Sequence, residues 1–170
     1  MSNLPPFTPS HVANFILDNA EKEDLPITPL KLLKLVYLCY GWVRAITDLR
    51  LFEEHFEAWD YGPVVPSLYG EFKRYGGEVI PKFEKSYVYD FDERDPYIPR
   101  IVNNQRITSI MQKCWDAFKI YKASALVNET HETDGPWVTV YKKGKNNLLD
   151  DEAIKVFFQI KIRAYINASR

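Results

Sequence analysis

Apolar residues occupy nearly every side of one segment near the start of the chain, residues 28–46 (TPLKLLKLVYLCYGWVRAI). Thr28 is suited to cap a helix, and Pro29 fits the first helical position, where no amide proton is needed. A helix that is apolar on all sides is a buried one. A membrane span is not predicted, because the segment also carries two lysines and an arginine, each costing about 3 kcal/mol at a bilayer centre. The pattern therefore predicts the central helix of a soluble domain.

Helical spacing of apolar residues, three or four positions apart, recurs in several other segments. A short helix is predicted with Ser124 as its cap. The last helix is predicted to be capped by Asp150, and its apolar face extends to Tyr165 and Ile166. The predicted helices cover, in chain order, residues from Thr8 or Ser10 to 20, 28–46, 66–75, 104–121, the segment after Ser124, 136–143, and the segment from Asp150 to the end.

Two segments carry signals of β-structure or irregular structure instead. Residues 55–60 are predicted as a short strand or an irregular segment. Residues 78–102 contain alternating aromatic residues and recurring prolines, which predicts a small hairpin or an ordered loop. The fold class is therefore mainly α: a single compact helical domain of about six to seven helices around a buried central helix, with a small β-hairpin or irregular segment near residues 80–100. Residues 1–9 are predicted as an extended arm ahead of a domain that spans residues 10–168.

The composition fits one folded domain of 170 residues. Hydrophobic residues make up 46% of the chain and aromatic residues 15%, so a full core is available and disorder is not expected. The net charge of −1 gives no general electrostatic case for nucleic-acid binding. Cys39 and Cys114 fall within apolar helical patterns and are predicted to be buried free thiols. Because the N-terminus also lacks the basic and apolar regions of a secretion signal, a reducing cytoplasm is the expected location.

The sequence contains no enzyme motif: it lacks a phosphate-binding glycine loop, a CxxC pair and an HExxH helix. Thr130, His131 and Glu132 suggest a nucleophile beside a base, but a histidine that closes a helix end is the commoner situation. The three histidines are far apart and lack the spacing of zinc ligands. No catalytic residue, metal or cofactor is therefore predicted.

Lys31 and Lys34 lie one turn apart on the central helix and share a face. Their position is unusual, because the first turn of a helix disfavours cations. Two interpretations stay open. In one, the lysine stems cover the core and the ammonium groups reach water. In the other, the lysines meet an acid, either on a partner or inside the chain, where the acids between Glu84 and Asp95 are candidates.

Aromatic residues flank two tight turns, Tyr61-Gly62-Pro63 and Gly135-Pro136-Trp137. Tryptophan and tyrosine are also the residues that dominate the binding energy of protein interfaces. Trp59 and Trp137 lie next to these turns and are candidates for partial exposure, whereas Trp115 lies on an apolar helical stripe and is predicted to be core.

Three blocks of the chain, TPLKLLKLVYLCYGW, FEAWDYGPVVPSLYGEFKRYG and THETDGPW, together resemble the SocA-like Panacea domain. The blocks come in the family's order, and the resemblance spans about residues 10–160. One departure is Leu33, where the family often has glutamine between the two lysines. The family is known mainly as the antitoxin half of toxin–antitoxin pairs in bacteria and phages.

The resemblance implies a mostly helical, non-enzymatic protein that neutralises a cognate toxin, encoded by an adjacent gene, by binding it directly. Two alternatives stay open. One is a proteolytic adaptor that delivers the toxin to a ClpXP-type protease. The other is a DNA-binding or autoregulatory protein, weakly motivated by the basic residues Lys142, Lys143 and Lys145 and by those along the last helix. Motif positions carried over from the family give partner-binding candidates, namely Lys31, Lys34, Tyr37, Trp59, Tyr61, His131 and Trp137. The motif or structural positions are Thr28, Pro29, Gly62, Pro63 and Pro136.

Overall fold

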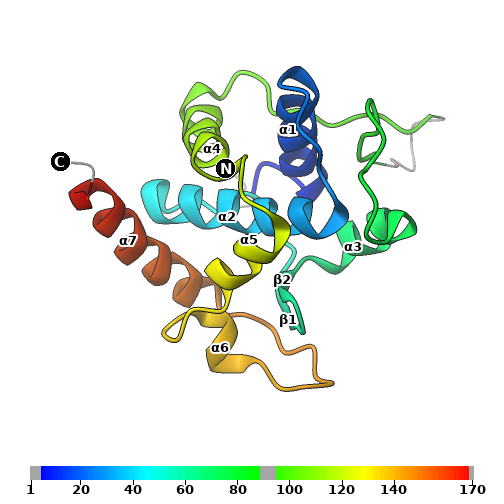
Figure 1. The fold of residues 1–170 in the computed structure, drawn as a ribbon. Helices are drawn as coiled ribbons and strands as arrows, with labels where there is room; N and C mark the ends of the chain where they lie inside the picture. Colours follow the sequence, from blue (N-terminus) through cyan, green and yellow to red (C-terminus); the bar gives the residue numbers. More distant parts are fainter. Residues whose placement is uncertain (1–4, 89–94, 169–170) are drawn as a thin grey trace.

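Helix α2 (Pro29–Thr47) lies at the centre of the structure, a computed structural model that describes residues 5–88 and 95–168 (Figure 1). Every residue of α2 from Lys31 to Arg44 is buried. The Thr28 hydroxyl caps the helix by accepting a hydrogen bond from the backbone amide of Lys31 (3.3 Å). The prediction of a buried central helix is confirmed.

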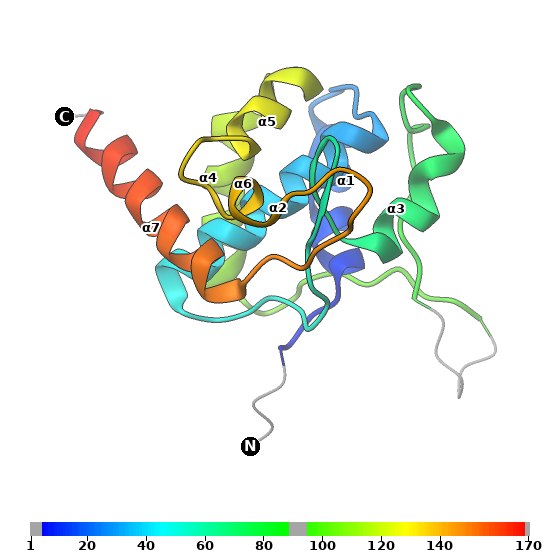
Figure 2. The same ribbon diagram turned by 90° about the horizontal axis from the view of Figure 1, so that it is seen from below.

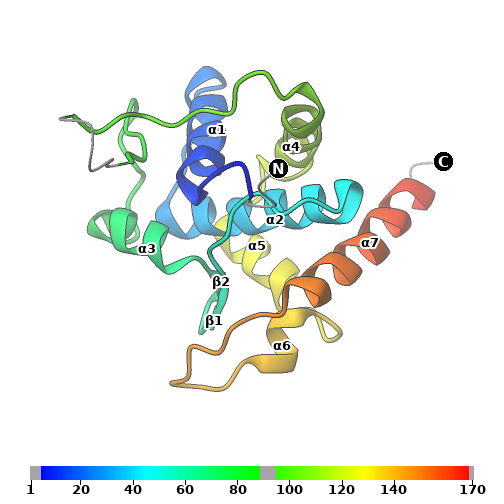
Figure 3. The same cartoon turned by 180° about the vertical axis from the view of Figure 1, so that it is seen from behind.

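The other helices pack around α2, as the views from below and behind show (Figures 2 and 3). In chain order they are α1 (Pro9–Lys22), α3 (Pro66–Phe72) with the 3₁₀ turn η1 (Lys73–Tyr75), α4 (Gln105–Phe118), α5 (Ala123–Thr130), α6 (Pro136–Val140) and α7 (Asp151–Ala168). Helices α1, α3, α4, α5 and α7 contact α2 directly, and α6 packs on α7. Within the described residues, seven α-helices and one small sheet confirm the mainly α fold class.

Helix starts follow the local capping chemistry in most cases. Thr8 is the N-cap of α1, and the Asp150 carboxylate caps α7 by accepting from the backbone amide of Ala153 (2.7 Å). The prediction that Ser124 caps α5 is wrong. The backbone bond from the Leu126 amide to the Lys122 carbonyl (3.1 Å) already closes a turn that contains Ser124, so Lys122 is the N-cap.

Helix α7 crosses α2 at Gly41, which allows the two helices to approach closely. A Cβ atom at position 41 would overlap the ring of Phe158, so only glycine leaves room for this crossing. Phe158 and Ile154 are buried on α7. Tyr165 and Ile166 are 56% and 48% exposed, against the sequence pattern, because the C-terminal half of α7 extends away from the other helices (Figure 1).

The sheet is a small antiparallel hairpin of β1 (Glu57–Trp59) and β2 (Gly62–Val64), with Ala58 opposite Pro63. It confirms a strand within residues 55–60. A backbone bond from the Ala58 amide to the Asn147 carbonyl (2.8 Å) joins β1 to the segment before α7. Strand β2 packs on α2.

Residues 78–102 are irregular wherever they are described. A single bridge between Val88 and Tyr97, with backbone bonds of 3.0 and 3.1 Å, is the β-pairing seen there. The residues between them, 89–94, lie outside the described part. Of the two predicted forms, a hairpin or an irregular segment, the described residues have the irregular one.

Two further expectations concern the interior and the membrane. Cys39 and Cys114 are both buried and free, as predicted, and Trp115 is fully buried. Among the helices that the structure describes, none combines the length and hydropathy needed to cross a bilayer.

Candidate functional site

Both lysines at the start of α2 end on backbone carbonyl groups. The Lys31 ammonium donates to the carbonyl of Lys119 (2.6 Å), the residue that ends α4. The last carbonyls of a helix lack partners within it and carry its negative partial charge. Lys31 therefore neutralises the end of α4, which explains a cation in the first turn of α2.

Lys34 is fully buried, and its ammonium donates to the carbonyl of Pro63 in β2 (2.7 Å). Burial lowers the pKa of Lys34 from 10.5 to about 7. The interpretation that its ammonium reaches water is therefore wrong for this side chain. An internal acid near residues 84–95 is also wrong in the described part of the chain, because Glu84 bonds Arg74 (3.0 Å) and Lys34 has only the carbonyl.

The hairpin turn closes over Lys34 at Gly62. This residue has φ +99°, a conformation that favours glycine. A Cβ atom there would lie 2.5 Å from Thr130 Oγ1 and 3.0 Å from Lys34 Nζ. The glycine thus lets the backbone of the turn lie directly on the lysine and on the end of α5.

His131, which ends α5, stacks flat on Trp137 of α6, with ring centroids 3.7 Å apart and an angle of 7°. Trp137 in turn donates from its indole nitrogen to the carbonyl of Trp59 at the end of β1 (2.8 Å). This chain of contacts fastens α5, α6 and the hairpin together. We call it the hairpin clamp: Lys34, Gly62, Pro63, Trp59, His131 and Trp137.

The clamp does not assemble the nucleophile and base considered for Thr130 and His131. The Thr130 hydroxyl donates to the carbonyl of Val127 in its own helix (2.8 Å). His131 Nε2 is buried and lacks a hydrogen-bond partner among the described residues. Burial, and secondarily the charge of Lys34, lowers the pKa of His131. Its observed role is to stack on Trp137 inside the clamp.

Aromatic side chains of the hairpin and of α3 form an accessible surface. Tyr61, at the tip of the hairpin, is 69% exposed. Trp59 is partly buried, and its ring meets that of Tyr69 edge to face at 4.6 Å. A groove of about 590 Å³ lies beside these residues, between the hairpin, α3 and the start of α2. Tyr69 was not identified from the sequence; the available signal was its position on α3 away from the buried residues Leu68 and Phe72.

The partner-binding candidates thus fall into distinct environments. Lys31, Lys34, Tyr37 and Trp137 are buried, and Tyr37 packs between Phe56 (5.1 Å) and Phe158 (5.4 Å). Trp59 and His131 are partly exposed and Tyr61 is exposed. Partner binding by any of them stays a prediction. Among the structural positions, Pro29, Gly62, Pro63 and Pro136 are also buried.

The comparisons with known proteins place these features in a family. A family model described as "Antitoxin SocA-like, Panacea domain" matches residues 32–138, a range that contains the whole hairpin clamp. The chain belongs to the SocA-like Panacea domain family. Antitoxin SocA from Caulobacter vibrioides is 30% identical over 155 residues, covering 88% of this chain and 81% of the relative. No solved structure was found with significant similarity to this Panacea domain.

The described residues of this Panacea domain contain no cluster of three or more histidine, cysteine, aspartate or glutamate side chains able to hold a metal ion. The three sequence blocks instead have structural roles that can be named. The first supplies the buried lysines, the second the hairpin and α3, and the third the stacked His131 and Trp137.

Proposed function

We propose that this chain is an antitoxin that neutralises a cognate protein toxin by binding it directly. The observation that carries the proposal is the match to Antitoxin SocA, which extends over most of both chains. The match to the family model covers the positions of every member of the hairpin clamp. The clamp supports the same proposal, because it fastens the hairpin to α5 and α6 while leaving Tyr61 and part of Trp59 exposed. Binding sites on rigid scaffolds are better defined than sites on loose loops.

The test is co-expression with the products of the adjacent genes. We expect one neighbour to stop growth when expressed alone and to be harmless when this chain is present. Purified toxin and antitoxin should then form a stable complex by size-exclusion chromatography. The absence of a toxic neighbour, or growth rescue without a complex, contradicts neutralisation by direct binding.

Toxin lifetime separates blocking from delivery to a protease. If the chain only blocks the toxin, the half-life of the toxin in cells is unchanged by the antitoxin. If the chain acts as a proteolytic adaptor, the half-life shortens when the antitoxin is present and recovers when the protease gene is deleted.

A further inference from the structure

The groove beside the hairpin is the strongest candidate for the surface that meets the partner. We define the hairpin groove by its lining, which includes Leu30, Leu33, Trp59, Asp60, Tyr61, Tyr69 and Lys73, together with Gly144 and Asn146 from the turn before α7. Its lining comes from α2, β1, the hairpin turn, α3, η1 and the turn before α7, so distant parts of the chain converge there.

The apolar part of the groove is aromatic and accessible. Tyr61 is 69% exposed, and its ring and hydroxyl have no partner among the described residues. Tyr69 is 39% exposed, and its edge-to-face contact with Trp59 holds both rings in place. Rigid tyrosine and tryptophan rings lose little entropy on binding and are the commonest hot-spot residues of protein interfaces.

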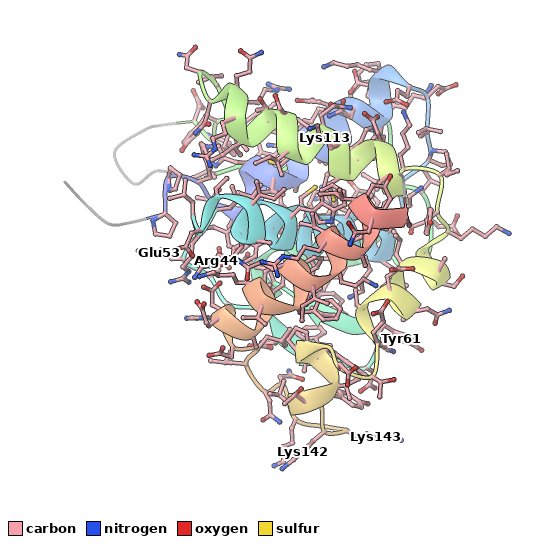
Figure 4. The ribbon with its side chains drawn as sticks, turned by 90° about the vertical axis from the view of Figure 1, so that its left-hand side faces the viewer. Arg44, Glu53, Tyr61, Lys113, Lys142 and Lys143 are labelled. Atoms are coloured by element: carbon pink, nitrogen blue, oxygen red, sulfur yellow. The ribbon has the colours of Figure 1, made fainter. Side chains whose placement is uncertain are left out.

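The rim of the groove is basic. Lys73 lines it, and Lys142, Lys143 and Lys145 are exposed on the turn that contains Gly144. None of these four lysines forms an ion pair with a described residue, whereas Lys85, Lys119 and Lys155 each do. Figure 4 shows Lys142 and Lys143 at the bottom of the molecule, Tyr61 above them in its lower half, and Lys113 in its upper part.

Two acids of the hairpin, Asp60 in the lining of the groove and Glu57 in β1, each accept a hydrogen bond from an aromatic side chain. The carboxylate of Asp60 accepts from the Tyr141 hydroxyl (2.9 Å), and that of Glu57 accepts from the Trp59 indole (2.7 Å). Together with Lys73, Lys142, Lys143 and Lys145, these two carboxylates give a sum of +2 over six side chains, opposite in sign to the −1 of the whole chain.

We propose that the hairpin groove binds a protein segment that has an apolar centre flanked by aspartate or glutamate residues. The aromatic lining takes the apolar centre, and the unpaired lysines on the rim attract the flanking acids. The inference rests on the proposed function in that the toxin is the protein expected to supply this segment. A nucleic acid fits less well, because the chain as a whole is not basic.

Designed peptides test the groove independently of any toxin. One probe has a leucine–phenylalanine–leucine centre flanked by glutamates, and the matched probe has lysines in place of the glutamates. The full chain labelled with ¹⁵N provides internal reporters: the indole signal of Trp59 in the groove and that of Trp115 in the core. We expect the acidic peptide to shift the Trp59 signal and not the Trp115 signal. It should bind about tenfold more tightly than the basic peptide, and its affinity should fall as the salt concentration rises.

Variants then assign the binding to the groove. The double charge reversal Lys142→Glu, Lys143→Glu should weaken the acidic peptide about tenfold, and Tyr61→Ala should weaken it about thirtyfold. The control Lys113→Glu changes an exposed, unpaired lysine in the upper part of the molecule (Figure 4) and should leave binding unchanged. Equal binding of the two peptides, no binding, or displacement by a short single-stranded oligonucleotide at moderate salt would overturn the proposal.

The same variants in the co-expression assay separate this inference from the proposed function. If the native chain neutralises the toxin and the groove variants do so equally well, the chain is an antitoxin and the groove is not its binding surface. If the native chain neutralises nothing, the antitoxin proposal fails, while the peptide experiment still decides whether the groove binds acidic segments.

Discussion

Replacing Lys34 by methionine should make the protein more stable at neutral pH. Methionine is unbranched and similar in length, so it can fill the same buried space. The substitution removes an ammonium group that is fully buried and has a single carbonyl, that of Pro63, as its partner. Conversely, it leaves this carbonyl without its hydrogen bond.

The size of the effect follows from the pKa of Lys34. Burial lowers it from 10.5 to about 7, and a tenfold change in proton affinity is worth about 1.4 kcal/mol. Keeping the lysine buried therefore costs about 4 kcal/mol of folding free energy at pH 7 and about 2 kcal/mol at pH 9. The orphaned carbonyl costs the variant about 2 kcal/mol. Lys34→Met should thus be about 2 kcal/mol more stable at pH 7 and about equally stable at pH 9.

The sign of the pH dependence follows from proton counting. Between the folded and unfolded pKa values, the unfolded chain binds more protons at Lys34 than the folded chain, so native stability rises with pH across this window. Below the folded pKa the full cost of burial is present. Urea unfolding followed by tryptophan fluorescence at pH 7, 8 and 9 and constant ionic strength measures the difference between the two proteins.

The same substitution at an exposed lysine is the control for the effect of burying Lys34. Lys113→Met on α4 should leave the difference from the native chain constant over the same pH range. If the free-energy difference between Lys34→Met and the native chain does not change with pH, the ammonium is not the cause, and the reasoning is refuted.

Two further predictions concern the same clamp. Gly62→Ala should destabilise the protein by about 2–4 kcal/mol, because the residue has φ +99° and no room for a Cβ atom. The control Gly77→Ala, with open space around it, should be nearly neutral. Thermal unfolding measures both variants, and equal destabilisation by the two would contradict this account. Burial lowers the pKa of His131, so its contribution to stability falls as the pH drops below 6.5. His131→Phe should keep the stack on Trp137 and make stability fall less steeply between pH 7 and pH 5 than in the native chain, where His11 contributes a dependence of the same sign; an equal slope in urea unfolding of the two proteins would disprove this.

The sequence predicts the central helix well because its pattern admits one interpretation. Apolar residues on all sides of residues 30–46 require burial wherever the rest of the chain goes. The caps at Thr28 and Asp150 are similarly local. Each side chain accepts a hydrogen bond from the backbone amide three residues later, so the cap can be found from sequence spacing alone.

The partners of Lys31 and Lys34 could not be predicted, because backbone carbonyls leave no signature in a sequence. A search for acids considers only side chains, whereas these ammonium groups end on Lys119 and Pro63. The prediction that Tyr165 is buried failed for a different reason. Periodicity defines an apolar face of α7, but it does not tell how far along that face other helices extend.

Because Lys34 is buried beneath the hairpin, its chemical modification would report on opening of the hairpin. A buried amine with a pKa of about 7 is largely unprotonated in mildly alkaline solution, the form that attacks acylating reagents, yet the closed hairpin shields it from them. If the hairpin opens, the amine becomes accessible to such a reagent and its pKa returns toward that of an ordinary lysine. Where reclosing is faster than the reaction, acylation of Lys34 should accumulate in proportion to the fraction of time that the clamp is open, and mass spectrometry of the peptide that contains Lys34 measures it.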